Sequence, residues 1–486
     1  MRTSDLKVIF LSSEATPYAK TGGLGDVSGA LPREIKKLGV DIQLVLPFYW
    51  SINNKDVQTS LVSTVDIPMG EYRLKAKIHE TVGEGGLAVY LIEREDMYQR
   101  PNLYGGACGD YYDNFERFAF FSLASLRLCE KWNQDTKIIH CNDWQTGLVP
   151  VLLRGLYSSC PKLSKIKSVF TIHNIGYQGI FPREKLPLTG LNQEEFFHPE
   201  GLEYWGKIST LKAGIVFSDA VTTVSPRYAK EIQSPGYGMG MEGILCAHRN
   251  KLHGILNGVD NNSWDPKKDK YLPATYDVEQ MEEKRVCKER LLQQLRLQKG
   301  TKVPLLCMVT RLDKQKGLDL LLEVMDALMK EELCVVILAS GEKEIEEELR
   351  KTASRYPQKM AFIKGFDEAM AHRIIAGSDI LMMPSRYEPC GLTQMYASKY
   401  GTVPVVRATG GLDDTVQEFD PKSGKGNGFK FRPYEACEFL AALKRALAFY
   451  SDQRQWQRII SNAMKCDFSW RRSAEQYIDL YESLLE

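Results

Sequence analysis

The stretch 384–416 combines a carboxylate with two turns that lead from apolar strands into helices. The first turn carries Glu388 and, near the start of its helix, Thr393, and the second carries Gly410 and Gly411. Unpaired backbone N–H groups and the dipole at a helix N-terminus attract phosphates and other anions. We therefore predict that this stretch is half of a sugar-nucleotide site and that the rest of the chain supplies the other half.

The first half of the chain also places polar side chains where predicted strands end. They are Glu14, Lys20, Asp143 and His173. In open α/β sheets, ligands bind beyond the carboxyl ends of the strands. A single histidine in a loop is more often a structural residue than a functional one, but the recurrence of polar groups at several strand ends favours a binding function.

A glycine loop, KTGGLGDV at residues 20–27, follows the first predicted strand. It lacks the GxGxxG spacing of a dinucleotide fingerprint and the Gly-Lys-Ser/Thr ending of a P-loop. Lys20 stands just before Gly22 and Gly23 and directs a cation at the entrance of the next helix. From the loop alone, a phosphate cradle and a structural turn are equally good interpretations.

The elements that position these residues alternate between strand and helix. Short continuous apolar runs, such as 8–11 and 305–310, are typical of parallel strands covered on both faces. The strand–glycine loop–helix–strand order at 8–47 is a βαβ unit. We predict an α/β protein of two doubly wound domains, 1–260 and 261–467, with a polar linker at 261–270.

Three further predictions concern individual segments. Residues 60–95 have the pattern of β-hairpins, and the Phe-rich run from Asn114 to Cys129 has the spacing of a core helix. The Tyr/Gly-rich stretch from Tyr98 to Tyr112 is predicted to be a surface loop near an active cleft.

The composition excludes several classes of protein. A length of 486 residues requires more than one core, and 43% hydrophobic with 26% charged residues is ordinary for a globular protein. A net charge of +1 does not support a nucleic-acid or membrane surface. Eleven cysteines without a CxxC pair argue against zinc and a disulfide framework. With no predicted signal peptide or membrane-spanning run, the expected location is the cytoplasm.

Several motifs together resemble those of the bacterial glycogen synthases and plant starch synthases. They occur in order along nearly the whole chain: KTGGLGDV (20–27), HCNDWQ (140–145), TIHNIGYQG (171–179), LNGVD (256–260), TRLDKQKGLDL (310–320) and the stretch 384–416. The resemblance implies a GT-B glycosyltransferase, with two Rossmann-like domains facing a deep cleft and a C-terminal segment, 468–486, that packs back on the first domain. No transit peptide is predicted before the glycine loop, and we therefore expect the bacterial type.

The activity implied by the resemblance is transfer of glucose from ADP-glucose to the non-reducing 4-OH of an α-1,4-glucan, with retention of configuration. The partners would be ADP-glucose or ADP and a glycogen or malto-oligosaccharide acceptor, with no cofactor. The resemblance implies a role for fifteen residues: Glu388, His173, Arg311 and Lys316 as catalytic groups; Lys20, Gly22, Gly23, Asn257, Thr393, Gly410 and Gly411 as donor and diphosphate contacts; and Glu14, Asp143, Cys390 and Gly391 as sugar contacts.

Glu388 has two interpretations. Retaining hydrolases use a carboxylate pair, one member of which is a nucleophile. No second carboxylate of such a pair is evident, so we favour a Glu388 that orients sugar hydroxyls or supports the cationic centre, with departure and attack on the same face. Cys390 is expected to pack beside the site, because glycosyl transfer needs no thiolate. The sequence has neither a DxD motif nor ligand spacing for a metal, and none is predicted.

Two rival functions remain open. A glucan phosphorylase-like protein shares the architecture but needs pyridoxal phosphate on a lysine, and a non-catalytic glucan-binding protein would need no donor site. The joint presence of Lys20, Arg311, Lys316 and Glu388 argues against the second. A preference for UDP-glucose is also open, because the base pocket is expected to consist mostly of backbone and apolar contacts.

Overall fold

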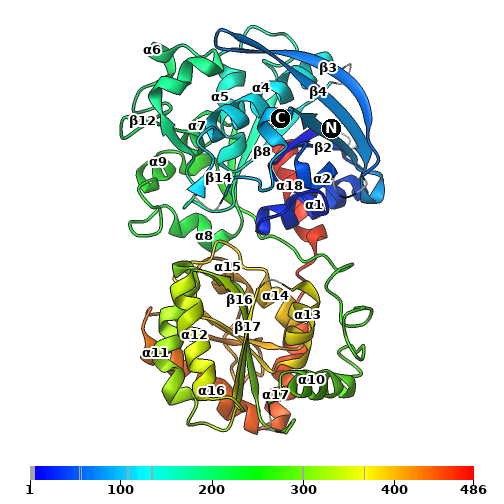
Figure 1. The fold of residues 1–486 in the computed structure, drawn as a ribbon, viewed down its shortest axis with the longest axis vertical. Coiled ribbons are helices and arrows are strands. Elements are labelled where there is room, and N and C mark those ends of the chain that lie inside the picture. Colours follow the sequence, from blue (N-terminus) through cyan, green and yellow to red (C-terminus); the bar gives the residue numbers. More distant parts are fainter. Residues whose placement is uncertain are drawn as a thin grey trace. The chain divides into compact units, whose positions relative to one another are not determined.

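The computed structural model describes residues 6–53, 55, 57–106, 109–132, 135–297, 300–365 and 367–486. The chain divides into two compact units, Met1–Gly258 with Trp470–Glu486, and Val259–Ser469. Each unit is a sheet flanked by helices (Figure 1). The predicted domain boundaries lie after residues 260 and 467. In the structure, the chain passes from one unit to the other after Gly258 and after Ser469.

The sheet of the first unit has the strand order β14-β13-β9-β8-β1-β2-β5-β4-β3. The strands from β14 to β5 run parallel, and β4 and β3 extend the sheet as an antiparallel hairpin. Most of the parallel strands are buried apolar runs, as strands covered by helices on both faces require. The strands are β1 (Lys7–Leu11), β2 (Asp41–Pro47), β3 (Ser60–Met69), β4 (Tyr72–Val82), β5 (Ala88–Glu93), β8 (Ile138–Asn142), β9 (Lys167–Ile172), β13 (Ala220–Thr223) and β14 (Leu252–Gly254).

From β1 the chain adds strands first towards β5 and then, starting at β8, towards β14. The direction of winding therefore reverses between β1 and β8. Ligands of doubly wound folds bind at the carboxyl ends of the strands on either side of such a reversal. The loops that follow β1 and β8 are the first places to look for a site in this unit.

The helices of the first unit begin and end close to the signals in the sequence. The glycine loop leads into α1 (Gly23–Lys37), and Gly39, just past its end, has a φ of 96°, which suits glycine. The predicted Phe-rich core helix is confirmed as α4 (Asn114–Lys131), whose phenylalanines are buried. The other helices are α2 (Trp50–Asn53), α3 (Glu95–Tyr98), α5 (Leu148–Arg154), α6 (Gln193–Phe196), α7 (Thr210–Phe217), α8 (Pro226–Glu231) and α9 (Glu242–Ala247).

The last helix, α18 (Trp470–Ser483), belongs to the first unit and lies beside α1 (Figure 1). Tyr481 lies in hydrogen-bond contact with Nδ1 of the buried His140 at 2.6 Å, and the Ser473 hydroxyl donates to the Leu256 carbonyl at 2.5 Å. The other ring nitrogen of His140 contacts the Thr171 hydroxyl. His140 therefore ties the C-terminal helix to the sheet.

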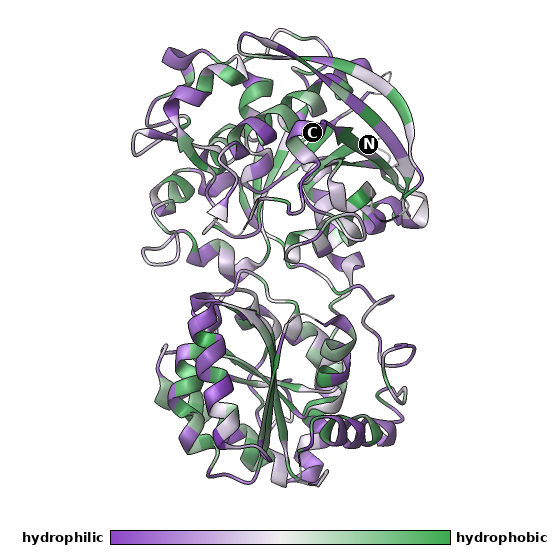
Figure 2. Cartoon of the chain, in the orientation of Figure 1, coloured by the Kyte–Doolittle hydropathy of each residue, from purple (hydrophilic) through white to green (hydrophobic). Residues whose placement is uncertain are grey.

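The second unit has a parallel sheet in the order β17-β16-β15-β18-β19-β20. Successive residues of β15 and β16 alternate between two hydrophobic cores, one on each face of the sheet. In Figure 2 the strands of this unit are mostly green and α12 mostly purple. Its elements are α10 (Glu282–Gln294), β15 (Leu305–Leu312), α11 (Leu318–Leu328), β16 (Cys334–Gly341), α12 (Lys343–Arg355), β17 (Met360–Lys364), α13 (Glu368–Gly377), β18 (Ile380–Met383), α14 (Thr393–Lys399), β19 (Val403–Arg407), α15 (Gly410–Thr415), β20 (Phe429–Phe431), α16 (Ala436–Ser451) and α17 (Gln453–Met464).

The segment 261–270, predicted to be a polar linker, is instead packed against the second unit. Trp264 stacks on His372 and on Tyr396, with ring centroids 3.6 and 4.0 Å away. Asp269 lies 2.6 Å from His372 Nδ1 and accepts a hydrogen bond from the Tyr400 hydroxyl at 2.6 Å. The polar composition of the segment gave no sign that Trp264 and Asp269 contact buried residues more than 100 positions further along the chain.

The stretch from Tyr98 to Tyr112 is only partly the predicted surface loop. Tyr98 ends α3 and is fully buried, and its hydroxyl donates to the Arg117 carbonyl at 2.7 Å. Two short strands, β6 (Gly105–Gly106) and β7 (Gly109–Asp110), form a small hairpin. Residues 107 and 108 lie outside the described residues.

Among the described residues, no helix combines the length and the apolar character needed to cross a membrane.

Candidate active site

In the second unit, the winding of the sheet reverses between β15 and β18. The loop after β15 carries Lys316, and the loop after β18 carries Glu388. Gly317 allows these loops to lie close together. A Cβ atom there would lie 2.0 Å from the Pro384 carbonyl oxygen, and the φ of Gly317 is 70°, which favours glycine. The fold thus brings a lysine and a glutamate to the position where doubly wound proteins bind their ligands.

Lys316 and Glu388 form an ion pair with two contacts. The Lys316 Nζ lies 3.0 Å from Oε1 and 2.8 Å from Oε2 of Glu388. The Ser385 hydroxyl donates to Oε2 at 3.0 Å. The side chains are only 15% and 6% exposed, so solvent screens the pair weakly. Both oxygens of the carboxylate are therefore engaged by donors from this unit.

Arg311 lies near the end of β15 with its side chain 54% exposed. One of its terminal nitrogens lies 3.4 Å from an Asp313 carboxylate oxygen. An ion pair this exposed contributes little, roughly 0–1 kcal/mol, to the free energy of folding. The Asp313 contact would therefore oppose binding of an anionic ligand by Arg311 only weakly.

The two turns of the stretch 384–416 differ in their backbone N–H groups. At the start of α14, the N–H groups of Gly391, Leu392 and Thr393 have no hydrogen-bond partner within the part of the chain that the structure describes. At the start of α15, by contrast, the Gly411 N–H donates to the carbonyls of Glu388 and Pro389 at 3.1 and 3.2 Å. The prediction of open donors at both turns is wrong for this amide.

The glycines of the second turn are explained by packing. A Cβ atom at Gly410 would lie 1.9 Å from the Glu388 carbonyl oxygen, and one at Gly411 would lie 2.0 Å from that of Cys390. Gly410 also has a φ of 45°. These two residues allow α15 to approach the loop that carries Glu388, and so they position the carboxylate.

Cys390 and Gly391 lie in the same loop. Cys390 is buried, and its carbonyl accepts a hydrogen bond from the Gln394 side chain at 3.1 Å. Gly391 has a φ of 70°, and a Cβ atom there would lie 2.5 Å from Gln394 Oε1. The two residues shape the turn into α14, which agrees with a positioning role for Cys390.

In the first unit, Glu14 follows β1 and organises the glycine loop. Its Oε2 accepts from the N–H groups of Thr21 and Gly22 at 2.6 and 3.1 Å, and its Oε1 accepts from the Thr21 hydroxyl at 2.6 Å. The Tyr104 hydroxyl donates to Oε1 at 2.7 Å. Glu14 was predicted to be a sugar contact. In this structure its carboxylate oxygens accept hydrogen bonds from the glycine loop and from Tyr104.

The glycine loop itself leaves space beside its backbone. A Cβ atom at Gly22 or Gly23 would meet nothing within 4 Å, and Gly22 has extended backbone that any residue adopts. Packing within the described chain therefore gives no reason for glycine at these positions, in contrast to Gly410 and Gly411. Lys20, 41% exposed, forms an ion pair with Asp26 at 2.6 Å.

Asp143 and His173 follow β8 and β9 and are held together. Asp143 Oδ1 accepts from the His173 backbone N–H at 2.7 Å, and His173 Nε2 lies 2.9 Å from Asn142 Oδ1. Burial raises the pKa of Asp143 to about 7, against the opposing effect of hydrogen bonds from the backbone of His173 and Asn174. Burial lowers the pKa of His173 to about 3, so its ring is neutral at pH 7. With Asn142 Oδ1 as the acceptor, Nε2 carries the proton and Nδ1 can accept.

Asn257 is buried in the loop after β14. Its side-chain oxygen has no hydrogen-bond partner among the described residues. A buried carbonyl oxygen without a donor is costly, by about 1–3 kcal/mol, unless a ligand or water supplies one. This oxygen is suited to accept a hydrogen bond from a ligand.

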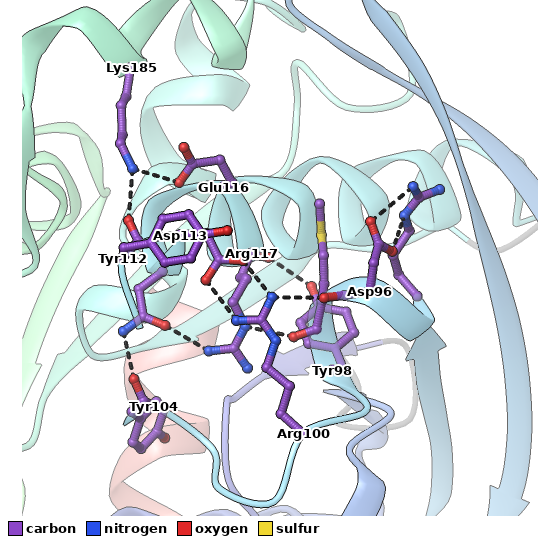
Figure 3. A network of polar contacts seen from close by, with 12 residues as sticks. Asp96, Tyr98, Arg100, Tyr104, Tyr112, Asp113, Glu116, Arg117 and Lys185 are labelled. Atoms are coloured by element: carbon purple, nitrogen blue, oxygen red, sulfur yellow. Dashed lines mark hydrogen bonds and ion pairs between the residues drawn. The ribbon is translucent and has the colours of Figure 1, made fainter. Parts of the chain in front are cut away.

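Three residues outside the predicted site, Tyr104, Asn114 and Arg117, extend the Glu14 network into the core. Figure 3 shows Tyr104 and Arg117 with the polar contacts around them. The Asn114 side-chain amide donates to the Tyr104 carbonyl at 2.8 Å, and Arg117 donates to Asn114 Oδ1 at 2.6 Å and to the Met97 carbonyl at 2.7 Å. Arg117 is fully buried and its guanidinium lies within 6 Å of three aromatic rings, those of Tyr98, Tyr111 and Phe118. Only the Tyr/Gly composition of the loop hinted at a function here.

No group of three or more His, Cys, Asp or Glu side chains suited to a metal ion occurs in the described part of the chain.

The comparisons with known proteins cover both units. Residues 7–247 match the family model described as the starch synthase catalytic domain, and residues 291–465 match that of glycosyl transferases group 1. A glycogen synthase of Desulforamulus reducens is 43% identical over 482 residues, which is 99% of each chain. The chain belongs to the glycogen synthase and starch synthase family. One from Bacillus cereus is 42% identical over 484 residues, or 99% of this chain and 100% of the other.

Solved structures agree with this family. The catalytic domain of starch synthase IV from Arabidopsis thaliana, in a structure with ADP and acarbose, has a TM-score of 0.91 and 34% identity over 99% of both chains. A sucrose-phosphate synthase from Thermosynechococcus elongatus, with a TM-score of 0.62 and 18% identity over 99% of both chains, shares the fold alone. The predicted GT-B architecture and the prediction of a glycosyltransferase of the glycogen synthase family are confirmed.

Proposed function

We propose that this glycogen synthase family member transfers glucose from ADP-glucose to the non-reducing 4-OH of an α-1,4-glucan, with retention of configuration and release of ADP. The observation that carries the proposal is the Lys316–Glu388 pair at the switch point of the second unit. The related starch synthase IV structure that contains ADP and acarbose supports the choice of nucleotide and of glucan.

The leaving diphosphate would be held by the second unit. As the bond from glucose C1 to the diphosphate oxygen breaks, negative charge grows on that oxygen. Lys316 and Arg311 supply cations, and the open amides of Gly391 and Thr393 supply dipoles. Fixed groups of this kind stabilise the transition state more than the ground state.

Glu388 would orient the sugar and support the cationic centre. Its oxygens accept from Lys316 and Ser385, which fixes the orientation of the carboxylate. A bond between the acceptor O4 and C1 would form on the face from which the diphosphate leaves. The proton of the acceptor hydroxyl would pass to the departing phosphate oxygen, so that atoms and charge balance without an external base.

The first unit would contribute contacts to the donor and the transferred glucose. Asp143 and the neutral His173 offer acceptors for sugar hydroxyls, and Asn257 offers a buried oxygen. Lys20 and the open space beside Gly22 suit the diphosphate. The remaining predicted contacts, at Gly23 and Gly410, and the cytoplasmic location stay predictions.

One assay tests the proposal. The purified protein is supplied with ADP-glucose or UDP-glucose, with and without glycogen, and with EDTA in parallel. We expect nucleotide release and incorporation of glucose into glycogen with ADP-glucose, with at most a small rate with UDP-glucose and no loss in EDTA. Faster turnover of UDP-glucose, or no transfer with either donor, would contradict the proposal. A visible absorbance band from a lysine-bound pyridoxal phosphate would favour the phosphorylase alternative.

A further inference from the structure

A tryptophan stands almost fully in solvent at the tip of a hairpin in the first unit. Trp205 connects β11 (Glu203–Tyr204) with β12 (Lys207–Ser209), and it is 85% exposed. Its φ is 53°, in the left-handed region that bulky residues rarely occupy. Residues held in such conformations cost of order 1 kcal/mol and cluster at ligand sites. The hairpin thus keeps a large aromatic ring in water at the expense of backbone strain.

The hairpin is held firmly enough to present this ring. The Gly206 N–H donates to the Glu203 side chain at 2.6 Å, and the Lys212 Nζ donates to the Glu203 carbonyl at 2.5 Å. On its other edge, β12 pairs with β10 (Ile180–Pro182). The Tyr204 ring meets the Trp205 ring edge-on, with centroids 6.3 Å apart.

Trp205 belongs to a group of exposed apolar side chains on contacting segments that we call the β12 surface. Tyr204 reaches the next loop, because its hydroxyl would lie 2.5 Å from a Cβ atom at Gly240. The neighbouring Met239 carbonyl accepts from the Gln178 side chain at 3.0 Å. The exposed members of this surface are Trp205 (85%), Tyr177 (53%), Ile180 (43%) and Met239 (36%).

The β12 surface is continuous with residues of the candidate active site. The segment that carries Tyr177 begins directly after His173, at the end of β9. At its other end, Gly179 packs against Trp144, the residue after Asp143, with 2.9 Å between the Trp144 side chain and the position of a Cβ atom at Gly179. A polymer whose end lies near Asp143 and His173 can therefore continue along this surface without leaving the unit.

The chemistry of the surface matches an α-glucan. One face of each glucose ring presents C–H groups, which rest on the negative face of an aromatic ring, and its edge presents hydroxyls. The surface offers aromatic and apolar side chains, and Gln178, Glu203 and Lys207 on the same segments offer polar groups for the hydroxyls. The net charge of +1 offers no field for a polyanion.

We propose that the β12 surface, with Trp205 as its main contact, binds a segment of the acceptor glucan at a distance from the reacting end. This inference rests on the proposed function, since a glucan acceptor is part of that function. It adds a binding site that retains glycogen between successive transfers.

The test is the affinity of the purified protein for glycogen in the absence of donor, measured by retardation in native gels that contain glycogen. Loss of one aromatic stacking contact should weaken binding about tenfold in Trp205→Ala, and Trp205→Phe should retain most of the affinity. Trp50→Ala is the matched control, because Trp50 is an exposed tryptophan, at 46%, of the same unit outside this surface. The ratio of half-saturating glycogen to half-saturating maltotriose in the transfer assay should rise for Trp205→Ala alone.

The outcomes separate the two proposals. Wild-type affinity in Trp205→Ala would overturn the glucan surface while leaving the proposed function intact. Glycogen binding that depends on Trp205 in a protein that transfers no glucose would instead overturn the proposed function alone. If Trp205→Ala changes the oligomeric state in gel filtration and leaves glycogen retardation unchanged, the surface is an interface between copies of the chain.

Discussion

Lys316 lies 3.0 and 2.8 Å from the two carboxylate oxygens of Glu388, although the residues are 72 positions apart in the chain. The pair joins the loops that follow two adjacent parallel strands, β15 and β18. A carboxylate that accepts from an ammonium and from Ser385 is a weak nucleophile, because attack on C1 would require it to give up these partners. The contact therefore favours a Glu388 that supports the sugar over one that bonds to it.

We expect no covalent glucosyl intermediate on Glu388. The protein is incubated with a fluorinated ADP-glucose analogue that slows turnover, and its intact mass is then measured. The mass should equal that of the untreated protein. A protein heavier by one fluoroglucosyl group, with the label mapped to Glu388, would establish the nucleophile mechanism instead.

Tyr104→Phe should weaken donor binding with little effect on the fold. The Tyr104 hydroxyl donates to Glu14, which in turn holds the N–H groups of Thr21 and Gly22. Burial raises the pKa of Tyr104 well above its ordinary value, so the hydroxyl keeps its proton and remains a donor. Loss of this hydrogen bond to a charged group should raise the half-saturating ADP-glucose concentration about tenfold.

The control for this positioning role is Tyr112→Phe, because Tyr112 is 89% exposed. Steady-state kinetics should show the change in half-saturation for Tyr104→Phe and none for Tyr112→Phe. Equal donor half-saturation in wild type and Tyr104→Phe would mean that the network only stabilises the unit.

Asp143→Asn should remove a pH dependence of stability. The pKa of this carboxyl is about 7 in the folded protein, above its unfolded value of 3.8, so its contribution to stability is lost as the pH rises between these values. Each pH unit in that window changes the unfolding free energy by about 1.4 kcal/mol. Between pH 5 and pH 7 the wild type should therefore lose about 2–3 kcal/mol relative to Asp143→Asn. If the difference in unfolding free energy between the two proteins were the same at pH 5 and at pH 7, the raised pKa of the buried Asp143 carboxyl would be refuted.

Substitution of alanine for Gly410 should destabilise the protein, whereas substitution of alanine for Gly22 should leave its stability nearly unchanged. Gly410→Ala places a Cβ atom 1.9 Å from the Glu388 carbonyl oxygen at a φ of 45°, and should destabilise the protein by about 3 kcal/mol or more. Gly22→Ala meets open space, so its unfolding free energy should stay within about 0.5 kcal/mol of wild type. Its half-saturating ADP-glucose concentration should rise, because the methyl group occupies space proposed for the donor. A stable Gly410→Ala would contradict the packing role of this turn.

Much of the fold could be predicted from local patterns, and so could those residues of the candidate active site that come just after a strand. Apolar runs such as 8–11 and 305–310 mark parallel strands, and in such sheets the polar residues just after a strand gather at one edge. This reasoning located Glu388, whereas Lys316 was selected through the family resemblance and without knowledge of its contact with Glu388. The reasoning from strand ends also located Asp143 and His173, which the structure joins through a backbone hydrogen bond.

What could not be predicted depends on partners distant in the chain. Whether the Gly411 amide is open depends on the path of the 388–390 loop, and no local pattern encodes that path. Tyr104 reaches Glu14 across 90 positions, and Asp269 reaches His372 across 103. A polar or Tyr-rich composition resembles a solvated segment until such partners are known, which is why 261–270 was predicted to be a linker and 98–112 a surface loop.

The most direct test of the account is the rate of glucosyl transfer by Lys316→Ala with saturating ADP-glucose and acceptor. The matched control is Lys314→Ala, which removes an exposed lysine from the same turn. Loss of a fixed cation at the leaving group should lower the Lys316→Ala rate by about 10²–10³-fold in protein whose circular dichroism shows a folded chain, while Lys314→Ala transfers glucose at nearly the wild-type rate. A folded Lys316→Ala protein that also transfers glucose at nearly the wild-type rate would contradict the claim that this lysine stabilises the departing diphosphate.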